Sequence, residues 1–378
     1  MRIVILSHED SRTGAPILLL NLAKILKTDN HEVIFIIRRS VGHLFSSFSE
    51  LAPTYLASWS YKPKRIGRNI LKELGNYKRW KVAAEFIKKA DFILSNTITN
   101  GEFCAELSQW YNIPIATYIH ELGISPYFIT PTSSLNKVWA QSKAFFFPCK
   151  TVQLFYQENF GIKASDSYLL PYFIAHNQHI NKTDLNASTD DLDTFVVGGS
   201  GTVNWRKGTD TMVQLAKTFT EEYPDKKIRF VWKGVEKGSV ELLRLEYDIK
   251  MAGLQNVFLL LALDDDMEGF YRNIHLFLLT SHEDPYPLVV LEAAQYGKPS
   301  ICFDTAGGMP DFIEDDAGFA VPYLSVSAMS KKIVEYMDNR ALLASHSKCA
   351  MEKVAIRHSD PELILRSLFQ ILPALNKA

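Results

Sequence analysis

The stretch from residue 276 to residue 303 constrains the fold of this chain more than any other. Residues 276–279 form a short apolar run, and residues 299–303 form a second one. Between them, a turn-rich segment ends at Pro287, and a helical pattern follows up to Gly297. Two buried strands joined by a turn and a helix make a parallel crossover unit. The stretch therefore predicts a parallel sheet covered by helices.

The same alternation of strands and helices runs through the chain in two series, separated by a polar segment without apolar periodicity at 174–193. Strands of the first series are predicted at 2–6, 33–37, 91–94, 114–119, 145–148 and 168–171, with a helix at 16–26. The second series has strands at 194–197, 228–232 and 257–261, and helices at 209–220, 240–251, 267–272 and 325–339. We therefore expect an α/β fold of two doubly wound, Rossmann-like domains at 1–175 and 190–355, and a helical terminal segment at 356–378.

The start of the helix after Pro287 is a candidate phosphate site. The backbone N–H groups of Leu288 and Val289 have no partner within the helix, and the helix dipole is positive there. Asp284, in the preceding loop, can accept hydrogen bonds from sugar hydroxyls, and Glu292 lies about one and a half turns into the helix. Together these groups can hold both ends of a sugar nucleotide. A helix with an N-terminal acid and an ordinary surface Glu is the alternative interpretation.

A second candidate phosphate site is the glycine-rich stretch at 198–208, which follows the first strand of the second series. Its glycines permit close backbone approach, and Arg206 and Lys207 precede the next helix. Cations placed there can stabilise the charge that develops on a departing nucleoside diphosphate. A turn with solvated cations is the alternative.

The first half of the chain carries two further candidates. Gly14 lies in the loop after the first strand, on the usual ligand side of such a sheet, where it allows either close ligand approach or a tight turn. His120 follows the strand at 114–119, and a histidine there can exchange a proton with a sugar hydroxyl near neutral pH. A structural histidine whose hydrogen bonds are all satisfied is the alternative.

The paired carboxylates resemble the signature of retaining glycosyltransferases of the GT-B fold, family four (glycosyl transferases group 1), in which Glu, seven residues and a second Glu precede Ala. By this resemblance Glu292 binds the nucleotide ribose, and Asp284, shorter than the common Glu, contacts the donor sugar. Lys207 resembles the Lys of the family's Lys-Gly motif, which contacts the diphosphate. The Arg that is common six residues earlier is Gly201 here, so Arg206 would have to replace it.

The resemblance also implies a retaining reaction by front-face attack, in which the leaving phosphate acts as the base. No metal and no cofactor is expected. The catalytic residues it implies are His120, Asp284, Arg206 and Lys207. The donor-binding residues it implies are Gly14, Ala15, Gly199, Arg206, Lys207, Asp284, Tyr286, Leu288, Val289 and Glu292. The loop at 304–311 is similar to an acidic-loop region near the donor in that family. The GT-B resemblance further implies that the domain at 1–175 lies on the acceptor side and that the domain at 190–355 binds the nucleotide sugar. It also implies that a C-terminal helix within 356–378 crosses back to the first domain.

The function expected from these implications is that of a hexosyltransferase. It would move a sugar from a nucleoside diphosphate sugar to a hydroxyl of a glycan or lipid-linked acceptor, in bacterial surface polysaccharide or glycan biosynthesis. A non-catalytic sugar-nucleotide-binding protein is one alternative. A nicotinamide-dependent oxidoreductase is a weaker one, because the chain lacks a G-x-G-x-x-G turn and carries Arg38 and Arg39 where an acid should end the second strand.

The composition narrows the choice of partners. A net charge of -1 with 47% hydrophobic and 22% charged residues gives no overall attraction to nucleic acid, and four scattered cysteines suit a reducing compartment. We expect a cytoplasmic protein. Residues 62–89 carry ten Lys or Arg against two Glu. That segment predicts either peripheral contact with the inner face of a membrane or a solvated helix face.

Overall fold

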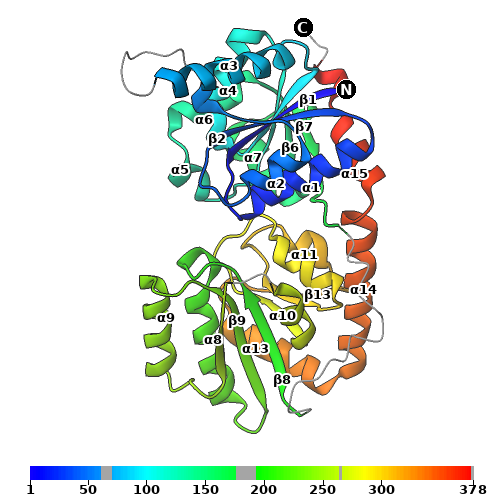
Figure 1. Cartoon of the computed structure of the whole chain (residues 1–378). Helices are drawn as coiled ribbons and strands as arrows, with labels where there is room; N and C mark the ends of the chain where they lie inside the picture. The colour runs from blue at the N-terminus through cyan, green and yellow to red at the C-terminus, as the bar shows by residue number, and fades with distance from the viewer. Residues whose placement is uncertain (61–69, 176–192, 264–265, 376–378) are drawn as a thin grey trace. The chain divides into compact units, whose positions relative to one another are not determined.

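The computed structural model describes residues 1–60, 70–175, 193–263 and 266–375, apart from the side chains of 59–60 and 70–77. The chain divides into two compact units (Figure 1). Unit 1 comprises Met1–Phe173 together with Asp360–Ala378, and unit 2 comprises Ile174–Ser359. Most of the predicted linker, 176–192, lies outside the described residues.

Unit 1 contains a parallel sheet of seven strands in the order β3-β2-β1-β4-β5-β6-β7. The strands are β1 (Arg2–Glu9), β2 (Glu32–Arg39), β3 (Thr54–Leu56), β4 (Phe92–Asn96), β5 (Ile115–Tyr118), β6 (Ser142–Phe147) and β7 (Ser167–Leu169). The helices are α1 (Gly14–Thr28), α2 (Phe45–Leu51), α3 (Ile70–Ile87), α4 (Gly101–Tyr111), α5 (Ser125–Ile129), α6 (Thr132–Gln141), α7 (Lys150–Phe160), α15 (Pro361–Phe369) and α16 (Leu372–Leu375). The order reverses between β1 and β4, as in a doubly wound sheet.

Helix α1 illustrates how the sequence specifies these elements. Leu18, Leu19, Leu22 and Leu26 are buried and recur at the helical period, so one face of the helix packs on the core. The helix begins two residues before the predicted start, because Pro16 fits within the first turn, where no backbone N–H is needed.

Unit 2 contains a parallel sheet of six strands in the order β10-β9-β8-β11-β12-β13. The strands are β8 (Phe195–Ser200), β9 (Ile228–Val235), β10 (Phe258–Ala262), β11 (Leu276–Leu279), β12 (Ser300–Phe303) and β13 (Gly318–Val321). The helices are α8 (Thr209–Glu222), α9 (Val240–Met251), α10 (Met267–Asn273), α11 (Leu288–Gln295), α12 (Met309–Ile313), α13 (Val326–Asp338) and α14 (Arg340–His358). Here the order reverses between β8 and β11.

Both sheets have the strand order of doubly wound folds, so the prediction of two Rossmann-like domains is confirmed. Three elements of unit 2 have no counterpart in the prediction. One is helix α12, which begins at Met309 within the segment predicted as a loop at 304–311. Strand β13 has only four residues, and its central two are not buried. Helix α14 buries few apolar residues, so its helical period is weak in the sequence. The predicted boundary after residue 355 falls inside α14, and the residues that return to unit 1 begin at Asp360.

Candidate functional site

The topology of unit 2 brings its two sequence motifs together. Strands β8 and β11 are neighbours, and the loops that follow them lie at the carboxyl edge of the sheet, where the strand order reverses. That reversal is the usual ligand position in open α/β sheets. The loop after β8 carries Arg206 and Lys207, and the loop after β11 carries Asp284. Residues 77 positions apart in the chain therefore meet at one edge.

The side chains of this cluster are paired. Lys207 Nζ lies 2.6 Å from Asp284 Oδ2, and Arg206 Nη1 lies 3.7 Å from Asp284 Oδ1. The carboxylate is 7% exposed, whereas the Arg206 side chain is 40% exposed. Two cations face one carboxylate, so the cluster keeps an excess of positive charge beside an exposed guanidinium. Such an arrangement can bind an anion with more than one negative charge.

A side-chain cap holds the loop of Lys207 in place. Residues Trp205–Lys207 form a single 3-10 turn, which Asn204 caps by accepting a hydrogen bond from the Lys207 amide at 3.0 Å. A Cβ at Gly201 would lie 3.3 Å from the Lys207 side chain. An Arg at position 201, as in the resembled family, would therefore crowd Lys207.

The loop of Lys207 and the loop at 304–311 hold the segment of Asp284 in place. The amide of His282 donates to the carbonyl of Arg206 at 3.0 Å, and Arg206 Nη1 donates to the carbonyl of Glu283 at 3.2 Å. The amide of Asp284 donates to the carbonyl of Ala306 at 2.8 Å. The predicted 304–311 loop thus touches the site through the backbone carbonyl of Ala306.

Helix α11 begins at Leu288 with Pro287 as its N-cap, so the Leu288 and Val289 amides lie in its first turn, as predicted. Further along the helix, Glu292 Oε2 accepts a hydrogen bond from the hydroxyl of Tyr271 on α10 at 2.7 Å. Burial raises the pKa of Glu292, and the Tyr271 hydrogen bond opposes that rise. A carboxylate in this setting can accept a second hydroxyl, such as that of a ribose.

Gly199 and Tyr286, both predicted to bind the donor, have structural tasks. A Cβ at Gly199 would lie 2.8 Å from the ring of Trp232, so only glycine fits beneath that ring. The side chain of Tyr286 is buried, and its hydroxyl lies 3.1 Å from His358 Nε2 on α14. Tight packing explains both residue types without a ligand, and their donor contacts stay predictions.

In unit 1, Ala15 and His120 belong to one hydrogen-bond network. Asn96, at the end of β4, donates from Nδ2 to the carbonyl of Ala15 at 3.1 Å, so its Oδ1 faces His120 Nε2 as an acceptor. His120 Nδ1 lies 2.9 Å from the Tyr172 hydroxyl. Nε2 must therefore carry the proton, while Nδ1 accepts from Tyr172. Gly14 is exposed at the first position of α1, beside this network.

Burial, with a smaller contribution from His8, lowers the pKa of His120 to about 3. The ring is therefore neutral at physiological pH, and both of its nitrogens are engaged. This is the bonding expected of the structural alternative, and a contact with a donor sugar stays a prediction. Burial also raises the pKa of the neighbouring residue Glu121, to about 7. Hydrogen bonds from backbone N–H groups to its carboxylate oppose that rise.

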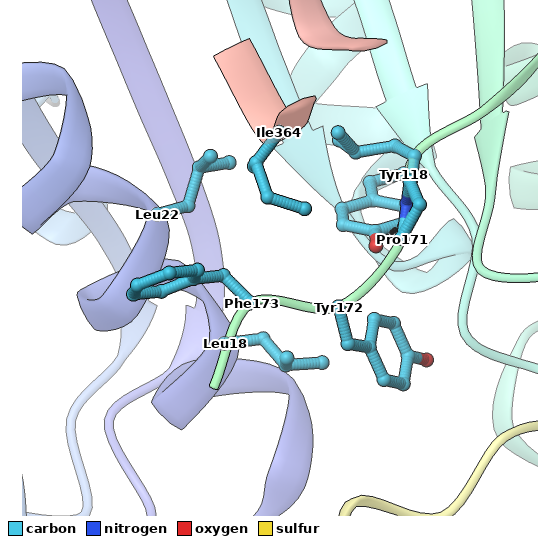
Figure 2. A pocket seen from close by; sticks show the side chains of 8 residues that line it. Leu18, Leu22, Tyr118, Pro171, Tyr172, Phe173 and Ile364 are labelled. Carbon is cyan, nitrogen blue, oxygen red and sulfur yellow. Dashed lines mark hydrogen bonds between the residues drawn. The ribbon is translucent and has the colours of Figure 1, made fainter. Parts of the chain in front are cut away.

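A small apolar cavity lies on the other side of Tyr172 (Figure 2). Its volume is about 10 Å³, and its lining residues are Leu18, Leu22, Tyr118, Leu170, Pro171, Tyr172, Phe173 and Ile364. A space of this size admits at most about one water molecule, so it is no substrate pocket. Figure 2 shows the Tyr172 hydroxyl pointing away from it.

Three residues that contact the predicted site residues were not themselves predicted: Asn96, Tyr172 and Tyr271. Asn96 follows a strand just as His120 does, so its position at the carboxyl edge was a usable signal. The sequence gives no such signal for Tyr172 and Tyr271, because a tyrosine in an apolar segment is usually a core residue. Their contacts with His120 and Glu292 depend on chain segments far away in sequence.

The predicted basic segment lies partly outside the described residues. In its described part, Lys78, Arg79 and Lys81 on α3 are exposed, whereas Trp80 and Ala83 are buried in the core of unit 1. This is the pattern of an ordinary solvated helix face. Among the described helices, none combines the length and apolar character needed to cross a bilayer. Within the part of the chain that the structure describes, no group of three or more His, Cys, Asp and Glu side chains could hold a metal ion.

Comparison with known proteins finds matches to part of this chain. Residues 181–353 match the family model described as "Glycosyl transferases group 1". The amylovoran biosynthesis glycosyltransferase AmsD of Erwinia amylovora is 27% identical over 151 residues, which are 38% of this chain and 42% of that protein. The lipopolysaccharide core biosynthesis mannosyltransferase LpcC of Rhizobium leguminosarum bv. viciae is 24% identical over 165 residues, 42% of this chain and 45% of that protein. The chain thus spans less than half the length of these curated relatives.

Solved structures match the whole chain. The Anabaena protein Alr3699/HepE, crystallised with UDP and glucose, has a TM-score of 0.79 at 17% identity, with all of both chains covered. The sucrose-phosphate synthase of Thermosynechococcus elongatus has a TM-score of 0.78 at 18% identity, covering 98% of this chain and 99% of that one. At these identities the likeness establishes a shared fold.

Proposed function

We propose that this chain, whose second unit matches the group 1 glycosyltransferase model, is a retaining glycosyltransferase of family four that uses a nucleoside diphosphate sugar. The observation that carries the proposal is the cluster of Arg206, Lys207 and Asp284 at the strand-order reversal of unit 2. A sugar diphosphate needs both cations and a hydroxyl acceptor within one small site. Arg206 and Lys207 supply the cations, and Asp284 supplies the acceptor.

Each group has a definite role in the proposed reaction. Lys207, Arg206 and the Leu288 and Val289 amides bind the diphosphate, and Asp284 accepts a hydroxyl of the sugar. The bond between the anomeric carbon and the β-phosphate oxygen breaks while the acceptor oxygen attacks from the same face. The acceptor proton passes to the leaving phosphate. Charge grows on the phosphates during this step, so fixed cations lower its barrier.

The remaining contacts belong to the nucleotide and to the first unit. Glu292, held by Tyr271, accepts hydroxyl groups of the ribose. Ala15 and His120 belong to a hydrogen-bonded edge of the first sheet that would contact the sugar or the acceptor. Gly14 is exposed there, so a ligand can approach its backbone closely. The acceptor is a hydroxyl of a glycan or a lipid-linked sugar in bacterial surface polysaccharide synthesis, as the names of AmsD and LpcC suggest by analogy. The protein would act in the cytoplasm. Contact of residues 62–89 with the inner face of the membrane stays a prediction, because the described part of α3 has the pattern of a solvated helix face.

The test is nucleotide release from a panel of nucleoside diphosphate sugars, beginning with UDP sugars because HepE was crystallised with UDP. One donor should be turned over far faster than the others, and proton NMR of the product should show the donor's anomeric configuration. Binding of a donor without release would favour the non-catalytic alternative. An inverted product would contradict the retaining mechanism.

Two variants assign the groups. Lys207→Ala should lower kcat by about 100-fold, because it removes a cation that acts on the leaving group. Glu292→Gln should instead raise KM by about tenfold with a smaller effect on kcat, because it weakens a contact made before and during reaction. Lys217→Ala, at an exposed lysine of α8, is the matched control and should leave both constants unchanged. Wild-type turnover in the Lys207 variant would remove that residue from the mechanism.

A further inference from the structure

Helix α9 has apolar residues on two opposite faces. Leu242, Leu245 and Ile249 are buried in the core of unit 2. On the opposite face, Val240, Leu243, Tyr247 and Met251 are 56%, 61%, 62% and 65% exposed. Their spacing of three, four and four residues places them in one continuous line along the helix. We call these four residues the α9 stripe.

A continuous apolar line on the surface differs from single exposed apolar residues, which are common. Figure 1 shows α9 at the edge of unit 2 beside α8. Val240, Leu243 and Tyr247 line an open groove of about 410 Å³ together with Arg244 and Asp248. Nothing in the described part of unit 2 covers this groove. The stripe has the spacing of a seam that packs against another helix.

Each flank of the α9 stripe carries one acid and one base. Arg244 and Asp248 lie on one flank, and Glu246 and Lys250 lie on the other. Each pair is four residues apart, and none of the ion pairs found among the described residues involves these four side chains. The same flank therefore offers both signs of charge to an approaching surface.

We propose that the α9 stripe is a twofold interface with a second copy of this chain, in which the two α9 helices pack antiparallel. A twofold axis near the centre of the helix sets each flank against the same flank of the other copy, running in the opposite direction. Arg244 then faces the partner's Asp248, and Glu246 faces the partner's Lys250. The α9 stripe of each copy packs against the α9 stripe of the other copy, so the surface is complementary to itself in shape and in charge.

The interface is one helix wide, which is small for a permanent dimer. Association therefore depends on protein concentration. Sedimentation velocity of the full chain over a concentration series should show a monomer–dimer equilibrium. In the double variant Leu243→Glu/Tyr247→Glu, dimer should be absent at every concentration tested. Ile356→Glu, at a 69% exposed position on α14, is the matched control and should associate like the wild type.

Charge reversal tests the antiparallel geometry. Arg244→Asp and Asp248→Arg should each weaken the dimer by about tenfold or more, because like charges then meet twice across the axis. The double variant R244D/D248R should restore association to near the wild-type level. A monomeric wild type, a dimer indifferent to the Leu243→Glu/Tyr247→Glu change, or a double reversal no better than the single ones would each overturn the proposal. Circular dichroism confirms that every variant is folded.

Discussion

At the scale of the residue, His120 shows how a fold can restrict what a titratable group does. Its Nε2 donates to Asn96, its Nδ1 accepts from Tyr172, and Asn96 is tied to the Ala15 carbonyl. Three segments that end at one edge of the sheet thus hold the ring in one tautomer. A neutral, fixed imidazole can orient a neighbouring hydroxyl, but it does not take up and release a proton near neutral pH.

This low pKa makes the stability of unit 1 dependent on pH. The unfolded chain takes up a proton at an ordinary histidine pKa of about 6.5, whereas folded His120 does so only at about 3. As the pH falls below 6.5, protons bind the unfolded state in preference to the folded one. Stability is therefore lost, by roughly 5 kcal/mol at most. Denaturant titrations should show a shallower loss between pH 6.5 and pH 4 in His120→Asn than in the wild type.

The control for that measurement is His43→Asn, at an exposed position of unit 1. Glu121, whose raised pKa acts in the opposite direction, is present in all three proteins, so comparing them isolates His120. Equal slopes for the wild type and the His120 variant would show that the ring titrates normally in the folded chain.

At the scale of the element, the turn between β8 and α8 determines where Lys207 lies. Gly208 ends the 3-10 turn with φ +69°, and its carbonyl accepts a hydrogen bond from the Thr280 hydroxyl at 2.8 Å. A Cβ at Gly208 would lie 1.8 Å from the carbonyl oxygen of Thr280. The loops after β8 and β11 can therefore approach each other only with glycine at this position.

Gly208→Ala should consequently destabilise unit 2 by roughly 3 kcal/mol or more, since a backbone clash adds to the left-handed strain. Gly253→Ala is a matched comparison, because Gly253 has φ +72° and no atom within 4 Å of its added Cβ. That variant should lose only about 1 kcal/mol, from strain alone. Chemical denaturation of both variants measures the difference, and equal losses would show that the close contact with Thr280 is absent.

At the scale of the whole molecule, the chain returns to its first unit after completing the second. Residues from Asp360 onward group with unit 1, where Ile364, Leu368 and Ile371 are almost completely buried. The cavity beside Tyr172 is lined by Ile364 as well as by residues near the start of the chain, such as Leu18. The last residues of the chain therefore complete a core that the first residues begin.

Leu368→Ala should destabilise unit 1 by about 3 kcal/mol, the usual loss for removing a buried leucine side chain. Arg366→Ala, at an exposed position of the same helix, should change stability by less than about 0.5 kcal/mol. Hydrogen exchange resolved along the chain distinguishes the units. Faster exchange is expected in strands of unit 1, such as β1, and not in β8. Equal acceleration in both units would contradict the assignment of this helix to unit 1 alone.

The sequence by itself determined the architecture and part of the site. Apolar runs and helical periods are local, so they predicted the two doubly wound sheets and the start of α11 near Pro287. They also placed Lys207 and Asp284 in the loops that precede α8 and α11. The pattern could not give β13, which is short and partly exposed, or the boundary after α14, because these depend on neighbours rather than on local period.

The tertiary structure alone decided which groups share a contact. Lys207 contacts Asp284, and the Tyr271 hydroxyl donates to Glu292. Both nitrogens of His120 have hydrogen-bond partners, and the Tyr286 hydroxyl contacts His358. A hydrogen bond or a Cβ clash depends on distances of a few tenths of an ångström between residues far apart in the chain. Such distances follow from the packing of whole elements, which no local pattern encodes.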